Sequence, residues 1–71
     1  MNELKSRPCL SKRELEVLAL VSQGRSNQQI ADELVISIET VKSHLKQVFF
    51  KMRVRGRTEA AARAIIFGWV Q

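Results

Sequence analysis

The chain has 71 residues, enough for one small domain with a modest core. A single cysteine excludes an internal disulfide, and Cys9 and His44 alone do not make a zinc site, so we expect no metal and no cofactor. Twelve lysines and arginines stand against seven acids, and the net charge of +5 favours an anionic partner, nucleic acid first and a membrane surface second.

Proline and glycine divide the chain into blocks of helical length. Pro8, the only proline, separates a polar segment from everything that follows. We expect residues 1–9 to form a flexible tail or the remnant of a linker, and residues 10–71 to form the folded domain. No alternating strand pattern with turn residues occurs, so the predicted fold class is all-α.

The first block opens with a capping box. Ser11 and Glu14 lie three residues apart, so each side chain can hydrogen-bond the backbone amide of the other. Apolar residues then recur at helical spacing, and Gly24 follows where a left-handed helix end is expected. These signals predict a first helix from about Lys12 to Gln23.

The second block repeats this pattern, with Ser26 and Gln29 as the capping box of a short helix. The inward stripe of this helix ends at Leu34, and Ser37 already has the residue type of the next N-cap. Only a tight turn fits between Leu34 and Ser37, so the two helices must cross steeply. This is the arrangement of a helix-turn-helix.

The third helix is predicted from Ser37 to Met52, and its two faces differ in chemistry. The apolar residues form one narrow stripe at helical spacing: Val41, Leu45, Val48 and Met52. The opposite face is mainly polar and comprises Glu39, Ser43, Lys46, Gln47 and Phe50.

The fourth helix is predicted from about Arg57 to Phe67, and it is apolar on more than one face. A helix of this kind in a small protein needs two surfaces to bury against. One is the domain core, and the other suggests a second copy of the chain. We therefore expect a homodimer interface that includes Ala62, Ile66 and Phe67.

Positive charge concentrates around the third helix. From Ser37 to Arg57 there are six lysines and arginines and one acid, whereas the first two helices carry four acids. A recognition helix in the DNA major groove needs one face that locks into the domain and another that offers donors to bases and phosphates. The third helix shows this division. On this face Lys42 and Lys46 are suited either to phosphates or to guanine acceptors, and Ser43 is small enough to let the backbone approach a groove.

Thr40 and His44 each have two interpretations. Thr40 either binds a phosphate or only supports the N-terminal cap of its helix. His44 lies beside the apolar stripe, and it either packs against the second helix or contacts a phosphate.

The motifs resemble those of the LuxR/FixJ/GerE family of DNA-binding domains. The resemblance covers residues 10 to about 64. It is carried by Leu10-Ser-Lys-Arg-Glu14, Glu16-Val-Leu18, Gly24, Ser26-Asn27, Ile30-Ala31, Ile36-Ser37-x-x-Thr40-Val41-Lys42-x-His44, Lys51-Met-x-Val54 and Arg57-x-Glu59-Ala60. It implies a four-helix domain whose third helix enters the major groove, and dimers that meet through the fourth helix on inverted half-sites. The positions that match the family's contacts with double-stranded DNA are Asn27, Thr40, Lys42, Ser43, His44 and Lys46. With this resemblance and the charge placement together, we expect Lys46 and Ser43 to contact base edges, and Thr40, Lys42 and Lys51 to contact phosphates.

Two positions depart from the family's pattern. Arg53 stands where the family often has a glycine that ends the third helix, and a non-glycine residue in a left-handed cap costs roughly 1 kcal/mol. This predicts a different helix end. Phe50 is apolar where a polar, outward residue is expected, and it suits a partner, another domain or the sugar-phosphate edge equally.

The predicted function is sequence-specific DNA binding by a transcription regulator. Family members are often C-terminal effector domains of longer regulators, so both an N-terminal sensor domain in a longer chain and a short stand-alone protein are consistent with the sequence. The alternatives are a protein-interaction module and an RNA-binding domain, although the stacking aromatics typical of RNA modules are lacking. No nucleophile–base constellation suggests an enzyme. No apolar run approaches the length that spans a membrane, and the N-terminus lacks the apolar core of a signal peptide. A cytoplasmic, nucleoid-associated protein without membrane contact is therefore expected.

Overall fold

The computed structural model describes residues 9–66 and 68 of the chain. This part contains four α-helices: α2 (Lys12–Ser22), α3 (Asn27–Leu34), α4 (Ile38–Met52) and α5 (Arg57–Ile66). The predicted all-α class and the order of the helices are confirmed. The predicted bounds of the first and third helices and the predicted start of the fourth agree to within about one residue, whereas the predicted end of the fourth, at Phe67, lies outside the described residues. Of the predicted tail, only Cys9 is described, and it is exposed. The predicted interface residue Phe67 also lies outside the described residues.

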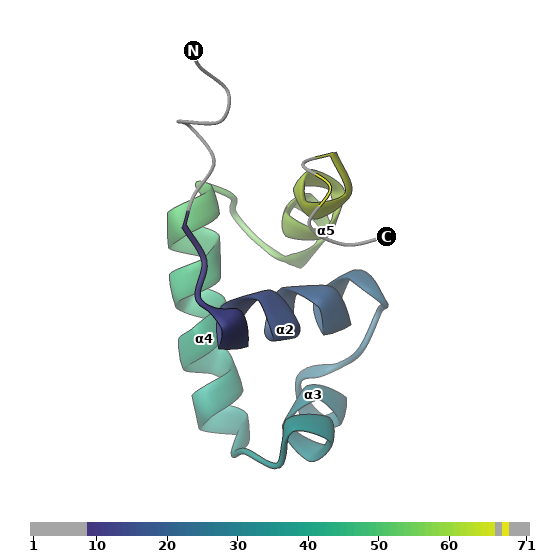
Figure 1. The fold of residues 1–71 in the computed structure, drawn as a ribbon. Coiled ribbons are helices and arrows are strands. Elements are labelled where there is room, and N and C mark those ends of the chain that lie inside the picture. Colours follow the sequence, from purple (N-terminus) through teal and green to yellow (C-terminus); the bar gives the residue numbers. More distant parts are fainter. Residues whose placement is uncertain (1–8, 67, 69–71) are drawn as a thin grey trace.

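Helix α2 lies at the centre of the domain. Figure 1 shows α2 lying across α4, with α3 beside the first part of α4 and α5 on the other side of α2. A short turn joins α3 to α4, and the two helices cross steeply, as the spacing of their caps predicts. The long helix α4 therefore lies along one side of the domain, where its outer face is left uncovered within the described chain.

The buried residues form two clusters on either side of α2. One cluster joins α2, α3 and the first half of α4, and comprises Val17, Leu20, Val21, Ile30, Ala31, Val41 and Leu45. The other joins α2, the end of α4 and α5, and comprises Leu18, Val48, Met52, Val54, Ala60 and Ala64. The predicted inward stripe of α4 is confirmed, because its four residues are divided between these clusters. Burial of each large apolar side chain stabilises the fold by roughly 1.5–3 kcal/mol.

Both predicted capping boxes are present. The Glu14 amide donates to Ser11 Oγ at 3.1 Å, and the Ser11 amide donates to Glu14 Oε1 at 2.9 Å. Ser26 and Gln29 repeat these two bonds with the same distances. Each box satisfies two amides that have no partner within their helix. The first residues of α2 and α3 are therefore defined by local sequence.

The end of α4 corrects the expectation from sequence. Arg53 adopts the left-handed conformation with φ +58°, the same kind of helix end as at Gly24. The Val54 amide donates to the Phe49 carbonyl at 3.0 Å, and the Arg53 amide donates to the Phe50 carbonyl at 3.2 Å. These bonds form a Schellman motif. The buried Val54 side chain, part of the second cluster, offsets the backbone cost, so α4 ends here without a glycine.

The turn between α3 and α4 also uses a left-handed residue that is not glycine. Val35 ends α3 with φ +58° and ψ +50°, and its side chain is 86% exposed. The next amide, that of Ile36, donates to the Ala31 carbonyl at 3.0 Å, and the Ile36 side chain packs against the first cluster. A β-branched residue is rare in this conformation. The tight turn is therefore strained at Val35, and this conformation places the Ile36 side chain against the first cluster.

Candidate nucleic-acid interface

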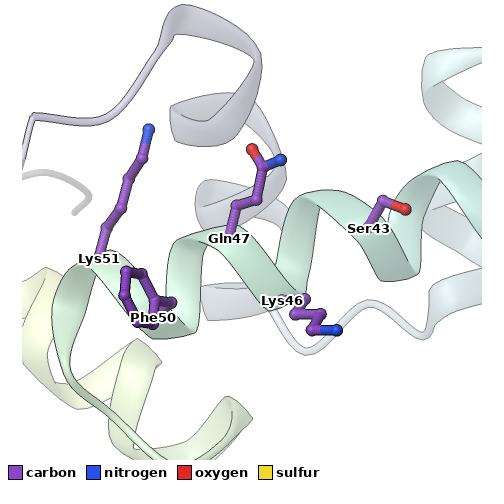
Figure 2. A pocket seen from close by; sticks show the side chains of 5 residues that line it. All are labelled: Ser43, Lys46, Gln47, Phe50 and Lys51. Carbon is purple, nitrogen blue, oxygen red and sulfur yellow. The ribbon is translucent and has the colours of Figure 1, made fainter.

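The outward face of α4 is a row of exposed side chains opposite the core. Ser43, Lys46, Gln47 and Phe50 are all exposed, and together with Lys51 they line an open hollow of about 450 Å³. Figure 2 shows Gln47 and Lys51 pointing toward one edge of the helix, with Lys46 and Phe50 nearer the other. The row combines a small hydroxyl, an amide, a cationic amine and an aromatic ring. These groups can donate to base acceptors and can also contact apolar base edges.

A second hollow, of about 370 Å³, lies along the flank of α4. It is lined by Asn27, Lys42, Leu45, Lys46, Phe49 and Arg57, which come from α3, α4 and α5. Three of these residues are cations and no acid lines the hollow. Glu39 pairs with Lys42 only weakly, at 3.9 Å with both side chains exposed. Lys46 borders both hollows. The flank is therefore suited to a phosphate beside the outward row.

Arg57 holds the start of α3 in place. Its Nη1 donates to Asn27 Oδ1 at 2.6 Å, and its Nη2 donates to the carbonyl of Arg25. Because the Asn27 oxygen accepts this bond, the Asn27 amide nitrogen is the part of the side chain left to donate elsewhere. Arg57 thus orients a predicted DNA-contacting residue that lies thirty positions earlier in the chain.

Thr40 takes part in the cap of α4. Its amide donates to Ser37 Oγ at 3.1 Å, and the two hydroxyl oxygens lie 2.9 Å apart. Two contacts therefore support the capping interpretation of Thr40. The contact of Thr40 with a phosphate stays a prediction. His44 is half-buried beside the inward stripe, so its contact with a phosphate also stays a prediction.

Lys51 has a structural partner that the sequence did not indicate. Its Nζ donates to Glu14 Oε1 at 2.9 Å, and the Glu14 side chain is only 3% exposed. Burial raises the pKa of Glu14, but hydrogen bonds from Lys51 and the Ser11 amide and the charge of Lys51 outweigh it, so the pKa lies below the ordinary value. Lys51 is 39% exposed, and an ammonium group has three donors. Its predicted phosphate contact and this ion pair are therefore compatible.

The structure gathers the predicted residues into two groups. Ser43, Lys46 and Lys51 line the hollow of the outward row, and Asn27, Lys42 and Lys46 line the flank. Sequence reasoning missed the positioning role of Arg57. It belonged to the predicted run of cations, but its contacts with α3 depend on the tertiary fold.

The predicted dimer surface is exposed to solvent in the single chain. Ala62 is exposed on α5, and Ile66 is 76% exposed. Ala60 and Ala64 of the same helix are buried in the domain. Helix α5 therefore has one apolar side in the core and another on the surface, as its composition predicts.

Among residues 9–66 and 68, no group of three or more histidine, cysteine or acidic residues could hold a metal ion. None of the helices in this part of the chain is long and apolar enough to span a membrane.

Comparison with known proteins gives consistent matches. Residues 8–64 match the family described as "Bacterial regulatory proteins, luxR family". The transcriptional regulatory protein LiaR of Bacillus subtilis is 47% identical over 55 residues, which are 78% of this chain and 26% of LiaR. The spore germination protein GerE of Bacillus subtilis is 39% identical over 66 residues, which are 93% of this chain and 89% of GerE.

A solved structure has the same fold. The response regulator ChrA of a heme-sensing two component system superimposes with a TM-score of 0.83 and 43% identity, over 89% of this chain and 31% of ChrA. The chain thus spans about a quarter of LiaR and about a third of ChrA, but most of GerE. The family match covers most of the chain and includes the whole helix-turn-helix. The chain belongs to the LuxR family of bacterial regulatory proteins, as a helix-turn-helix domain of the DNA-binding type.

Proposed function

We propose that this chain regulates transcription by binding a specific double-stranded DNA site, with α4 in the major groove. The observation that carries this proposal is the division of α4 into a buried apolar face and an exposed row beside a cationic flank. Its relatives include proteins described as transcriptional regulators. The proposal assigns the chain no catalytic activity and no cofactor. The chain acts in the cytoplasm, where it binds the DNA of the nucleoid.

In this proposal the two groups of residues have different tasks. Ser43 and Lys46 contact base edges, which carry the sequence information. The residues that contact phosphates and set the position of α4 are Asn27, Thr40, Lys42, His44 and Lys51. Phosphate contacts supply affinity that falls steeply with salt, because each releases condensed counterions.

The proposed active form is a homodimer on inverted half-sites. The exposed side of α5, with Ala62 and Ile66, supports this assembly because it offers apolar surface to a second copy. Half-sites read by one face of the duplex lie about one helical turn apart. Because LiaR and ChrA are three to four times longer than the part matched here, the domain also fits a longer regulator with an N-terminal sensor domain.

Titration of labelled duplexes across a salt series tests the proposal. Lys46→Ala should weaken binding to a selected site more than binding to random duplex. Lys42→Gln should weaken both equally and reduce the slope of log K against log salt by about 0.9. Arg63→Gln is the matched control, since it also removes one positive charge but lies on α5, paired with Glu59. The slope for this control should match that of the wild type.

Two outcomes would refute parts of this proposal. Absence of duplex binding at low salt, with the dimer intact, would indicate a protein-interaction module instead. Equal loss on selected and random duplex for Lys46→Ala would remove Lys46 from the base-reading residues.

A further inference from the structure

Phe50 lies on the outward face of α4, in the last turn of the helix (Figure 2). It follows the buried Val41 by nine residues, or about two and a half helical turns, so it points directly away from the core. Its side chain is 84% exposed, and it lines the same hollow as Ser43, Lys46 and Gln47. A phenyl ring held in water on a rigid helix contributes nothing to the stability of this domain. Its position indicates a role in binding.

The surroundings of the ring indicate what it binds. In the open hollow it is accompanied by two lysines, Lys46 and Lys51, and no acid lines that hollow. An apolar protein segment would have to bring its own acidic groups to this surface. Duplex DNA brings phosphates and, in the major groove, one apolar group: the C5-methyl group of thymine. The chemistry around Phe50 therefore matches DNA better than a protein partner.

The spacing along α4 agrees with this match. Phe50 follows Ser43 by seven positions, which is a rise of about 10 Å on the same side of the helix. Three base-pair steps of about 3.4 Å span the same length. When Ser43 faces one base pair, Phe50 is carried to a pair about three steps further along the groove.

We propose that Phe50 determines specificity by packing its ring against the C5-methyl group of a thymine in each half-site. This inference rests on the proposed function and adds to it a reader of an apolar base edge. Lys46 and Ser43 read hydrogen-bonding edges, whereas Phe50 distinguishes thymine from cytosine, which has no methyl group.

Replacement of thymine by uracil tests the proposal, because it removes only the methyl group. A binding site is first selected from random duplexes with the wild-type chain. Each thymine of one half-site is then replaced singly by deoxyuridine, and affinity is measured by fluorescence anisotropy. We expect one replacement to weaken wild-type binding about fourfold, the effect of one buried methyl group. Phe50→Ala should bind the thymine and uracil forms of that position equally.

The control variant is Val35→Ala, which shortens an equally exposed apolar side chain outside this hollow. It should retain the fourfold preference for thymine. The proposal is overturned when no thymine shows a preference, when Phe50→Ala retains it, or when Phe50→Ala binds the selected site as tightly as the wild type. That last result would assign the ring to a protein partner. Failure of the wild type to bind any duplex would instead overturn the proposed function itself.

Discussion

Replacement of Val35 by glycine should stabilise the domain. Val35 ends α3 in the left-handed conformation, which costs a residue with a Cβ atom about 1–2 kcal/mol. Its side chain is almost fully exposed, so little apolar burial is lost when it is removed. The change therefore relieves strain in the folded state without opening a cavity.

The size of the effect follows from two opposing contributions. Glycine avoids the left-handed penalty, but it also increases the backbone entropy of the unfolded chain by an amount worth about 0.5–1 kcal/mol. The net gain in free energy of unfolding is about 1 kcal/mol. For a domain of this length, such a gain raises the melting temperature by about 4–8 °C.

Thermal and urea unfolding followed by circular dichroism would measure this change. Val35→Ala is the control, because alanine keeps the Cβ atom and most of the left-handed penalty, so its stability should stay within about 0.5 kcal/mol of the wild type. A melting temperature for Val35→Gly at or below that of Val35→Ala would show that the turn is not strained.

Two further predictions concern acid stability and assembly. The lowered pKa of Glu14 contributes stability that is complete above its ordinary value of 4.5 and is lost as the pH falls through the lower value in the folded state. Glu14→Gln should therefore be less stable than wild type at neutral pH, and urea unfolding should show this difference shrinking below about pH 4.5; a constant difference would argue against the ion pair with Lys51. Ile66→Asp should shift the mass seen in analytical ultracentrifugation from dimer to monomer, while the exposed Leu15→Asp on α2 should not; unchanged mass for Ile66→Asp would exclude this part of α5 from the interface.

The helices were predictable because their signals are local. Both capping boxes, the N-cap at Ser37 and the stripe of α4 depend on residues a few positions apart, and the structure contains each of them. The end of α4 was mispredicted because the cost of a left-handed arginine is local, whereas the burial of Val54 that offsets it depends on α2 and α5.

The candidate site was predictable only in part, for a similar reason. The cations of α4 are visible as a run in the sequence. The bond from Arg57 to Asn27 joins residues thirty positions apart, and the ion pair of Lys51 with Glu14 joins residues thirty-seven apart. No local pattern encodes either contact, so the sequence indicated which residues are charged but not which of them position others.

The central place of α2 has a consequence for how the domain opens. Val17 and Leu18 are neighbours in the chain, yet each belongs to a different buried cluster. Loss of α2 would dissolve both clusters at once, so the domain should unfold as a single cooperative unit. A ligand held only by α4 then slows hydrogen exchange at amides of α5 as well, because both helices open through the same event. Ligand binding to α4 is thereby detectable as slower hydrogen exchange in α5, on the other side of α2, without any conformational change.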